Sequence, residues 1–192
     1  MNKEHVLFCI LGRTASGKDS LVNKLCERTG FKQIISYSTR ERRNNEGETH
    51  RFVTEEVYNV MLENGEVAVD TNIAGNYYWA TIEQLYENDI YILDYIGLKK
   101  LKTLNLPNLR LVSVFINTPD EIRKTRALKK RGDDRSKFRL RDINEKTQFK
   151  EMLKAADFDY AISNLDFAKA FSILKWIATT EGLFLNKEDT TE

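Results

Sequence analysis

The strongest constraint on the fold is a short apolar run that ends in a glycine-rich loop. The run is Val6-Leu-Phe-Cys-Ile-Leu11, and Gly12 follows it directly. A continuous apolar run of this length is typical of a strand that is buried on both faces of a parallel sheet. From Lys18 onward, apolar residues recur at helical spacing until Gly30, which favours a helix end. A second apolar stretch follows, so the N-terminal region predicts a strand, a loop, a helix and a strand.

Later segments repeat this alternation. The runs at residues 90–94 and 109–116 have the same buried-strand composition, and each precedes a helix-like segment. A weaker strand is predicted at residues 160–162. Helices are predicted at residues 54–64, 81–87, 119–130, 142–156 and 166–180, where capping residues or early prolines mark several starts. We therefore expect an α/β fold with a mostly parallel sheet flanked by helices.

The chain has the length and composition of one domain. It has 192 residues, of which 41% are hydrophobic, and this is enough for one well-buried core. Short alternating strands separated by glycines indicate an inserted subdomain, and a segment dense in charge indicates a mobile loop or lid. We expect a single domain over 1–192, with a core at 1–35 and 86–192, an insertion at about 36–85 and a lid at about 131–142.

Charge and cysteine content exclude several classes of partner. The chain has 30 Lys and Arg against 29 Asp and Glu, so no global field attracts nucleic acid or an anionic membrane. Cys9 and Cys26 lack metal-ligand spacing and are predicted to be reduced thiols.

No stretch approaches the roughly 20 apolar residues that span a bilayer, and the N-terminus lacks a signal pattern. We expect a cytoplasmic protein, monomeric or weakly dimeric, with no nucleic-acid or membrane partner.

The loop after the first strand has the composition of a phosphate-binding loop. Its sequence, Gly12-Arg-Thr-Ala-Ser-Gly17-Lys18-Asp19-Ser20, fits the pattern G-x-x-x-x-G-K. Glycines let successive backbone N–H groups converge on one centre, the lysine reaches the terminal phosphates, and the following helix presents its N-terminus to the anion. The motif predicts an ATP site. Its residues are Gly12, Thr14, Ala15, Ser16, Gly17, Lys18, Asp19 and Ser20.

One position of the loop departs from the usual motif and bears on metal binding. Asp19 stands where a Ser or Thr hydroxyl normally contacts Mg²⁺, and Ser20 comes one residue later. A carboxylate is a good ligand for Mg²⁺, so Asp19 is predicted to hold the metal directly or through water. Asp94 ends a buried strand at the edge where ligands bind in open α/β sheets, and it is predicted to order Mg²⁺-bound water. The alternative for Asp94 is to cap the following helix near Gly97.

Beyond the loop, the order and spacing of the motifs resemble the guanylate kinase family. Four segments carry the resemblance. They are Ser36-Tyr-Ser-Thr-Arg40-Glu-Arg-Arg43 (family S-x-T-T-R-x-x-R), Gly47-Glu-Thr-His50-Arg-Phe52-Val53 (G-x-D-Y-x-F-V), Gly75-Asn76-Tyr77-Tyr78 (G-N-Y-Y) and Ile92-Leu93-Asp94 (I-L-D). The likeness runs from the first strand to about Trp176. It implies a P-loop kinase fold and ATP-dependent, Mg²⁺-assisted phosphoryl transfer to a nucleoside monophosphate.

The resemblance also implies which residues bind the acceptor phosphate. Two arginines three positions apart, with hydroxyls beside them, can clamp a phosphate dianion. The resemblance assigns this role to Ser36, Arg40, Arg43 and Tyr78. His50 replaces the family's phosphate-side tyrosine and could still donate a hydrogen bond.

The charged segment occupies the place of the family's lid. The resemblance implies that lid arginines close over ATP and neutralise charge on the transferring phosphoryl group. The candidates are Arg131, Arg135, Arg139 and Arg141. The spacing between Arg126 and Arg131 is one residue longer than the family pattern.

The resemblance does not extend to the positions at which the family binds the guanine base. The family reads guanine with a glutamate, a serine and an aspartate, and this chain has Val69, Ala80 and Ile96 there. A site built to hydrogen-bond a base discriminates by about 10⁴-fold, so strict GMP specificity is not expected. Asp70 adjoins Val69 and could read a base from a shifted register, as could Asn72.

Three functions remain open from the sequence. The first is a nucleoside monophosphate kinase whose acceptor base is GMP or another nucleotide, with Trp79 either stacking on the base or blocking its pocket. The second is a kinase of a phosphorylated sugar, because Gly17-Lys-Asp-Ser-Leu21 also resembles the loop of ribose bisphosphate kinases. The third is a guanylate-kinase-like module that binds phosphopeptides, although such modules usually lack a working ATP loop.

Overall fold

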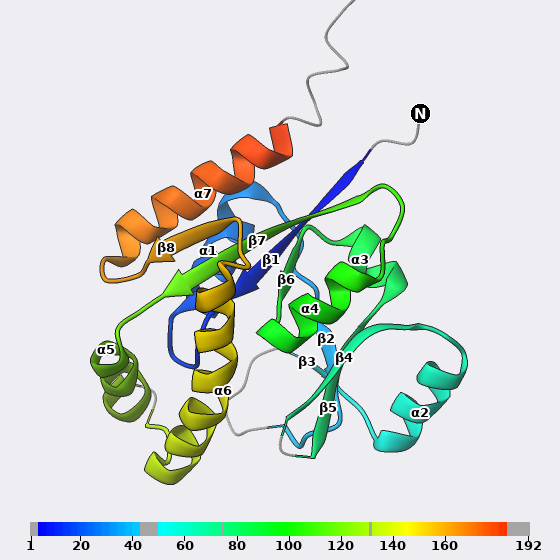
Figure 1. The fold of residues 1–192 in the computed structure, drawn as a ribbon, viewed down its shortest axis with the longest axis horizontal. Helices are drawn as coiled ribbons and strands as arrows, with labels where there is room; N and C mark the ends of the chain where they lie inside the picture. The colour runs from blue at the N-terminus through cyan, green and yellow to red at the C-terminus, as the bar shows by residue number, and fades with distance from the viewer. Residues whose placement is uncertain (1–3, 43–49, 74, 131, 184–192) are drawn as a thin grey trace, which may run out of the picture.

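A parallel sheet forms the centre of the molecule (Figure 1). The computed structural model describes residues 4–42, 50–73, 75–130 and 132–183. The four strands lie in the order β6-β1-β7-β8, and every pairing between them is parallel. They are β1 (His5–Leu11), β6 (Ile90–Ile92), β7 (Leu109–Asn117) and β8 (Tyr160–Ser163). The carboxyl ends of these strands therefore meet at one edge, and the predicted α/β fold is confirmed.

Helices cover both faces of this sheet (Figure 1). One face packs against α1 (Lys18–Thr29) and α7 (Phe167–Leu183), and the other against α3 (Ile82–Glu87), α4 (Tyr95–Thr103) and α6 (Arg135–Ala155). Alternate residues of β1 belong to the two cores: Val6, Phe8 and Ile10 face α1 and α7, while Leu7, Cys9 and Leu11 face the other side. This explains why the first strand is apolar without alternation.

A second, smaller sheet lies beside the first and supplies one wall of the site. Its order is β3-β2-β5-β4, and its strands are β2 (Ser36–Ser38), β3 (His50–Phe52), β4 (Val67–Ile73) and β5 (Asn76–Thr81). Helix α2 (Glu55–Glu63) packs against it through Tyr58, whose ring lies 4.9 Å from that of Trp79. Trp79 also stacks on Tyr37 at 5.3 Å and is fully buried. Trp79 therefore fills the core of the second sheet.

The charged segment differs from its prediction. A loop was expected over 131–141 and a helix from 142, but α6 already begins at Arg135. Asp134 caps this helix by accepting a hydrogen bond from the Lys137 N–H at 2.8 Å. The prediction was wrong because charge density alone does not prevent a helix: Arg, Lys and Leu are good helix formers once a cap is available. Arg131 lies outside the described residues.

The segment before α6 contains an unusual helix. Helix α5 (Asp120–Thr125) runs directly into a π-helix, η1 (Arg126–Lys130). A π-helix accommodates one additional residue in a helical path, and such bulges are frequent at functional sites. The segment that begins at Arg126 has one residue more than the family pattern, and the π-helix η1 can accommodate this additional residue.

Two of the remaining sequence observations have structural counterparts. Both cysteines are free thiols, and burial raises the pKa of Cys9 to about 12, so this thiol stays protonated at neutral pH. Among the helices of the described residues, none combines the length and the apolar character that a membrane crossing requires.

Candidate functional site

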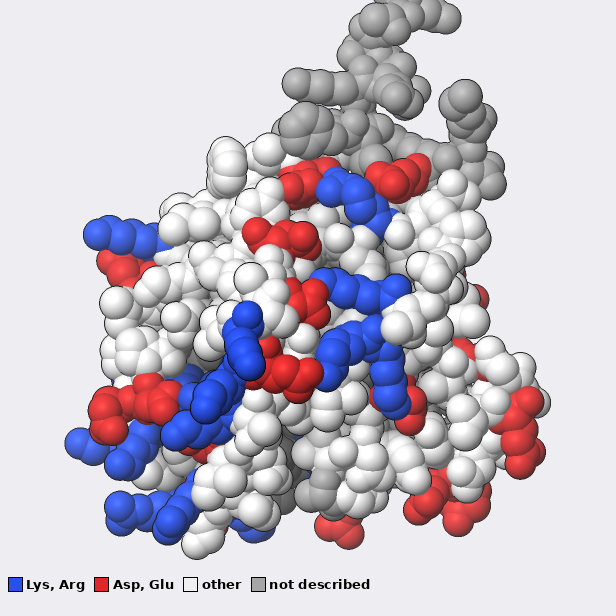
Figure 2. All heavy atoms as spheres, in the orientation of Figure 1, with Lys and Arg blue, Asp and Glu red and all other residues white. Residues whose placement is uncertain are grey.

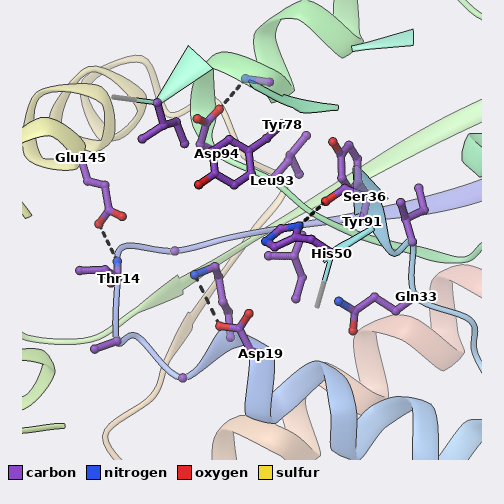
Figure 3. Close-up of a pocket in the computed structure, with 18 of the residues that line it drawn as sticks. Thr14, Asp19, Gln33, Ser36, His50, Tyr78, Tyr91, Leu93, Asp94 and Glu145 are labelled. Carbon is purple, nitrogen blue, oxygen red and sulfur yellow. Dashed lines mark hydrogen bonds and ion pairs between the residues drawn. The ribbon is translucent and has the colours of Figure 1, made fainter. Parts of the chain in front are cut away.

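A cavity of about 1310 Å³ opens at the carboxyl edge of the parallel sheet. Its walls come from the glycine loop, α1, the second sheet, Asp94 and α6. Figure 3 shows Thr14 and Asp19 on the loop side of this cavity, with Ser36, His50 and Tyr78 across from them. The cavity therefore joins the two groups of residues that the sequence predicts to bind phosphates.

The glycine loop has backbone conformations that favour glycine. Gly17 is the N-cap of α1 and has a φ of +88°, and a Cβ there would lie 2.5 Å from the Asn164 amide nitrogen. At Gly12, a Cβ would lie 2.6 Å from the Ser16 hydroxyl oxygen. A larger residue would collide with Asn164 at position 17 or with Ser16 at position 12, and the loop would have to shift.

Side chains from other segments donate hydrogen bonds to the carbonyl groups of the loop. The Ser16 carbonyl accepts hydrogen bonds from Thr118, Arg126 and Asn164 at 3.0, 3.0 and 2.7 Å. The Thr14 carbonyl accepts one from Arg123 at 3.0 Å. The first N–H groups of a helix have no partner inside it, so the start of α1 adds donors for an anion. These features agree with the predicted phosphate site, and that assignment stays a prediction.

Lys18 and Asp19 lie side by side at the end of the loop. The Lys18 ammonium lies 3.6 Å from the Asp19 carboxylate, and both residues line the cavity. The Lys18 side chain is 18% exposed, whereas that of Asp19 is 62% exposed. A partly buried ammonium beside loop amides attracts a polyphosphate, and a carboxylate is a suitable ligand for a metal ion.

Two roles are predicted for Asp94, ordering of Mg²⁺-bound water and capping of the following helix. It is the N-cap of α4, and its Oδ1 accepts a hydrogen bond from the Gly97 N–H at 2.7 Å. Its buried Oδ2 accepts no hydrogen bond from the described residues, and burial raises the pKa of the carboxyl group. Asp94 lines the cavity, and its role toward a metal ion stays a prediction.

The donor set fits a magnesium ion that is shared with the substrate. The described ranges contain no group of three or more His, Cys, Asp or Glu residues that could hold a metal alone. Mg²⁺ usually takes one or two carboxylates together with substrate phosphates and waters. Asp19 and Asp94 match that pattern, and their assignment as metal ligands stays a prediction.

The predicted acceptor-phosphate residues come together on the second sheet. Ser36 pairs with His50 across β2 and β3, and their side chains are joined at 2.8 Å between Oγ and Nδ1. The His50 ring lies 5.4 Å from that of Tyr78, and the Arg40 guanidinium lies 4.9 Å from the Phe52 ring centre. Ser36, Arg40, His50 and Tyr78 all line the cavity. Arg43 lies outside the described residues.

The base-reading positions of the family are apolar and packed. Val69 and Ala80 face each other directly across β4 and β5, and both belong to the core beneath α3, α4 and α6. Val69 is buried but lines the cavity, whereas Ala80 is fully buried and does not reach it. Ile96 is partly exposed on α4. These side chains offer a base no hydrogen bond.

Asp70 has partners within the protein. Its carboxylate accepts hydrogen bonds from the Tyr58 hydroxyl at 3.0 Å and from the Lys100 ammonium at 2.9 Å. Lys100 also donates to the Asp70 carbonyl at 2.8 Å. Asp70 lines the cavity, but reading a base with it would disturb these contacts between β4 and α4.

Of the described lid candidates, one reaches the cavity. Arg141 lines it and donates to Asp133 at 3.0 Å, while Arg135 is exposed at the first turn of α6.

Figure 2 shows basic side chains gathered over the end of the molecule formed by α5, η1 and α6, and acidic ones over α2.

Several residues that line the cavity were not among the sequence candidates. Arg126 donates to the carbonyls of Ser16 and Asn164, and desolvation lowers the pKa of its guanidinium group. Asn164 directly follows β8, so the rule that ligands bind at strand carboxyl ends could have identified it. Glu145 comes from the middle of α6 and reaches the loop, and no local pattern marks it (Figure 3).

Comparison with known proteins places these features in context. The sequence model described as "Guanylate kinase" matches residues 4–181. Curated guanylate kinases from Photorhabdus laumondii, Yersinia pestis and Salmonella typhi are each 28% identical, over 95% of this chain and 91% of theirs. A crystal structure of guanylate kinase from Anaplasma phagocytophilum is similar with a TM-score of 0.67 and 22% identity, covering 93% of this chain and 87% of that one.

Proposed function

This chain belongs to the guanylate kinase family, and from that premise we propose that it transfers the γ-phosphoryl group of ATP to a nucleoside monophosphate. One observation carries the proposal. A single cavity joins the loop of Lys18 to the cluster of Ser36, His50 and Tyr78, so two anionic substrates can lie with their phosphates facing each other. Since both substrates are nucleotides, we expect the protein to act in the cytoplasm.

The proposed mechanism depends on position and charge, and no strong base is needed. An acceptor phosphate oxygen attacks the γ-phosphorus in line, and negative charge spreads over the transferring group. Lys18 and the loop amides hold the donor, while Arg40, Ser36 and Tyr78 hold the acceptor. Arg141 would add positive charge when α6 approaches the phosphates. A bound Mg²⁺, held by Asp19 and Asp94, would neutralise charge on the donor phosphates.

We propose that the protein discriminates only weakly between acceptor bases. The side chains at positions 69, 80 and 96 cannot pair with the hydrogen-bonding edge of guanine, and Asp70 is engaged by Lys100. Burying the base edge against Val69 without partners would cost guanine the hydrogen bonds that it makes in water. We therefore propose an acceptor whose base is not selected as guanine.

Restoring the family's polar groups tests this proposal. The triple variant Val69→Glu, Ala80→Ser and Ile96→Asp is expected to raise the kcat/KM ratio of GMP to other nucleoside monophosphates by about 10²-fold or more. The wild-type protein is expected to show less than about tenfold preference among the same acceptors. Initial rates of ADP release over GMP, AMP, UMP, CMP, their deoxy forms and ribose bisphosphate measure both. A strong GMP preference in the wild-type protein would contradict the proposed weak reading of the base.

Arg40 is expected to act on the acceptor rather than on ATP. In the Arg40→Ala variant, the KM of the acceptor should rise about tenfold or more, because the guanidinium can pair with a phosphate dianion. The KM of ATP should change less than about twofold. Arg51→Ala is the matched control, since Arg51 lies on β3 and donates to the Tyr37 hydroxyl outside the cavity lining. A larger change in the KM of ATP would show that the two sites have been exchanged.

A further inference from the structure

The Glu145 carboxyl group extends from α6 to the glycine loop (Figure 3). Its Oε2 accepts a hydrogen bond from the Thr14 backbone N–H at 2.5 Å. Burial raises the pKa of the carboxyl group, while the Thr14 N–H and the positive charges of Lys18, Arg123 and Arg13 act in the opposite direction. The surroundings of this carboxylate, a loop amide and three cationic side chains, are those of an anion site.

A second carboxylate on the same helix fixes this arrangement. Asp142, one turn before Glu145, accepts hydrogen bonds from Arg13 at 2.8 Å and from Arg123 at 2.7 Å. Arg123 also donates to the Thr14 carbonyl, and its side chain is 1% exposed. Both backbone polar groups of Thr14 are thus engaged, one by α6 directly and one through Arg123. Helix α6 is docked on the loop through its acidic side chains.

The donor phosphates need the same loop. ATP brings several negative charges to the amides and the ammonium of Lys18, and the Glu145 carboxyl group already occupies the Thr14 amide. Two anions in a partly buried site repel each other much more strongly than in water. A bound terminal phosphate and an ionised Glu145 in its present position are therefore in conflict.

Resting on the function proposed above, we propose that Glu145 is an internal anion of the donor site, which sets the affinity for ATP and is displaced when ATP binds. Displacement releases the contact between Glu145 and Thr14, whereas Asp142 still joins α6 to Arg13 of the loop. Because α6 also carries Arg141, loss of the Glu145 contact would let this helix shift and bring positive charge toward the transferring phosphoryl group. In the absence of ATP, Glu145 keeps the Thr14 amide paired.

The test is a calorimetric titration with ATP and Mg²⁺ in the absence of any acceptor, so that no transfer takes place. Glu145→Gln removes the charge, but its amide oxygen can still accept from Thr14. The Kd for ATP is expected to fall about tenfold in this variant. Glu151→Gln is the matched control on the same helix: its carboxylate is 57% exposed and pairs with Lys99, so its Kd should stay within about twofold of the wild-type value.

Kinetics separate this role from a structural one. Glu145→Gln should lower the KM of ATP while the KM of the acceptor stays within about twofold. Glu145→Asp, one methylene shorter, should bind ATP about threefold more tightly than wild type because its charge lies farther from the loop. This variant serves as the test if Glu145→Gln does not fold.

The outcomes are distinguishable. Equal or weaker ATP binding by a folded variant, beside clear binding by the wild-type protein, would overturn the role of Glu145 and leave the proposed function standing. Absence of ATP binding by every variant and by the wild-type protein would overturn the proposed function and the inference together.

Discussion

Replacing Lys18 with alanine is expected to lower kcat/KM for phosphoryl transfer by about 10³-fold or more. The ammonium group lies at the end of the glycine loop, is 18% exposed and lines the cavity. Negative charge that develops on the phosphoryl oxygens is stabilised by a fixed cation far more in a dehydrated site than in water. The loss should appear in kcat as well as in the KM of ATP, because the interaction strengthens in the transition state.

A control variant separates this effect from a general change in charge. Lys99→Ala also removes one ammonium, but Lys99 pairs with Glu151 at the surface of α4. Its turnover should stay within about twofold of wild type. ADP release with saturating acceptor measures both variants. If Lys18→Ala keeps more than about a tenth of wild-type turnover while folded, the loop lysine does not act on the transferring group.

Replacing Arg123 with alanine is expected to lower the free energy of unfolding by about 3 kcal/mol. The guanidinium donates to Asp120, Asp142 and the Thr14 carbonyl, and it is almost fully buried. The substitution leaves a void and removes the partner of the Thr14 carbonyl, and both effects destabilise a folded protein. Urea unfolding measures the loss. Arg28→Ala, on the exposed face of α1, is the control and should change stability by less than about 0.5 kcal/mol.

The effect of Arg123 should depend on pH. Its hydrogen bond holds the pKa of the Asp120 carboxyl below its ordinary value. A depressed pKa contributes stability above the unfolded-state value, near 3.9 for Asp, and this contribution is lost as pH falls through the folded-state pKa. The stability difference between wild type and Arg123→Ala should therefore shrink below about pH 4. A difference that stays constant across this range would show that packing, and not the ion pair, stabilises this region.

The central sheet and its loop could be predicted because their signals are local. A continuous apolar run such as Val6–Leu11 is typical of a strand buried on both faces, and Gly17 can adopt the left-handed conformation that the loop requires. The capping of α4 by Asp94 was likewise visible as an alternative, because an N-cap depends on a residue three positions away.

Other features depend on contacts between distant segments. The engagement of Asp70 by Lys100 requires the packing of β4 on α4, thirty positions apart in the chain. Glu145 and Thr14 are 131 positions apart, so no spacing rule connects them. Such residues are found only once the parallel strands and helices are placed in space.

The most direct test of the account is chromatographic detection of the product formed from ATP, Mg²⁺ and a nucleoside monophosphate, with Lys18→Ala as the blank. A nucleoside diphosphate and ADP are expected to accumulate in equal amounts, with GMP and with at least one nucleotide of another base. ADP without any nucleoside diphosphate, or no reaction with any nucleoside monophosphate, would contradict it.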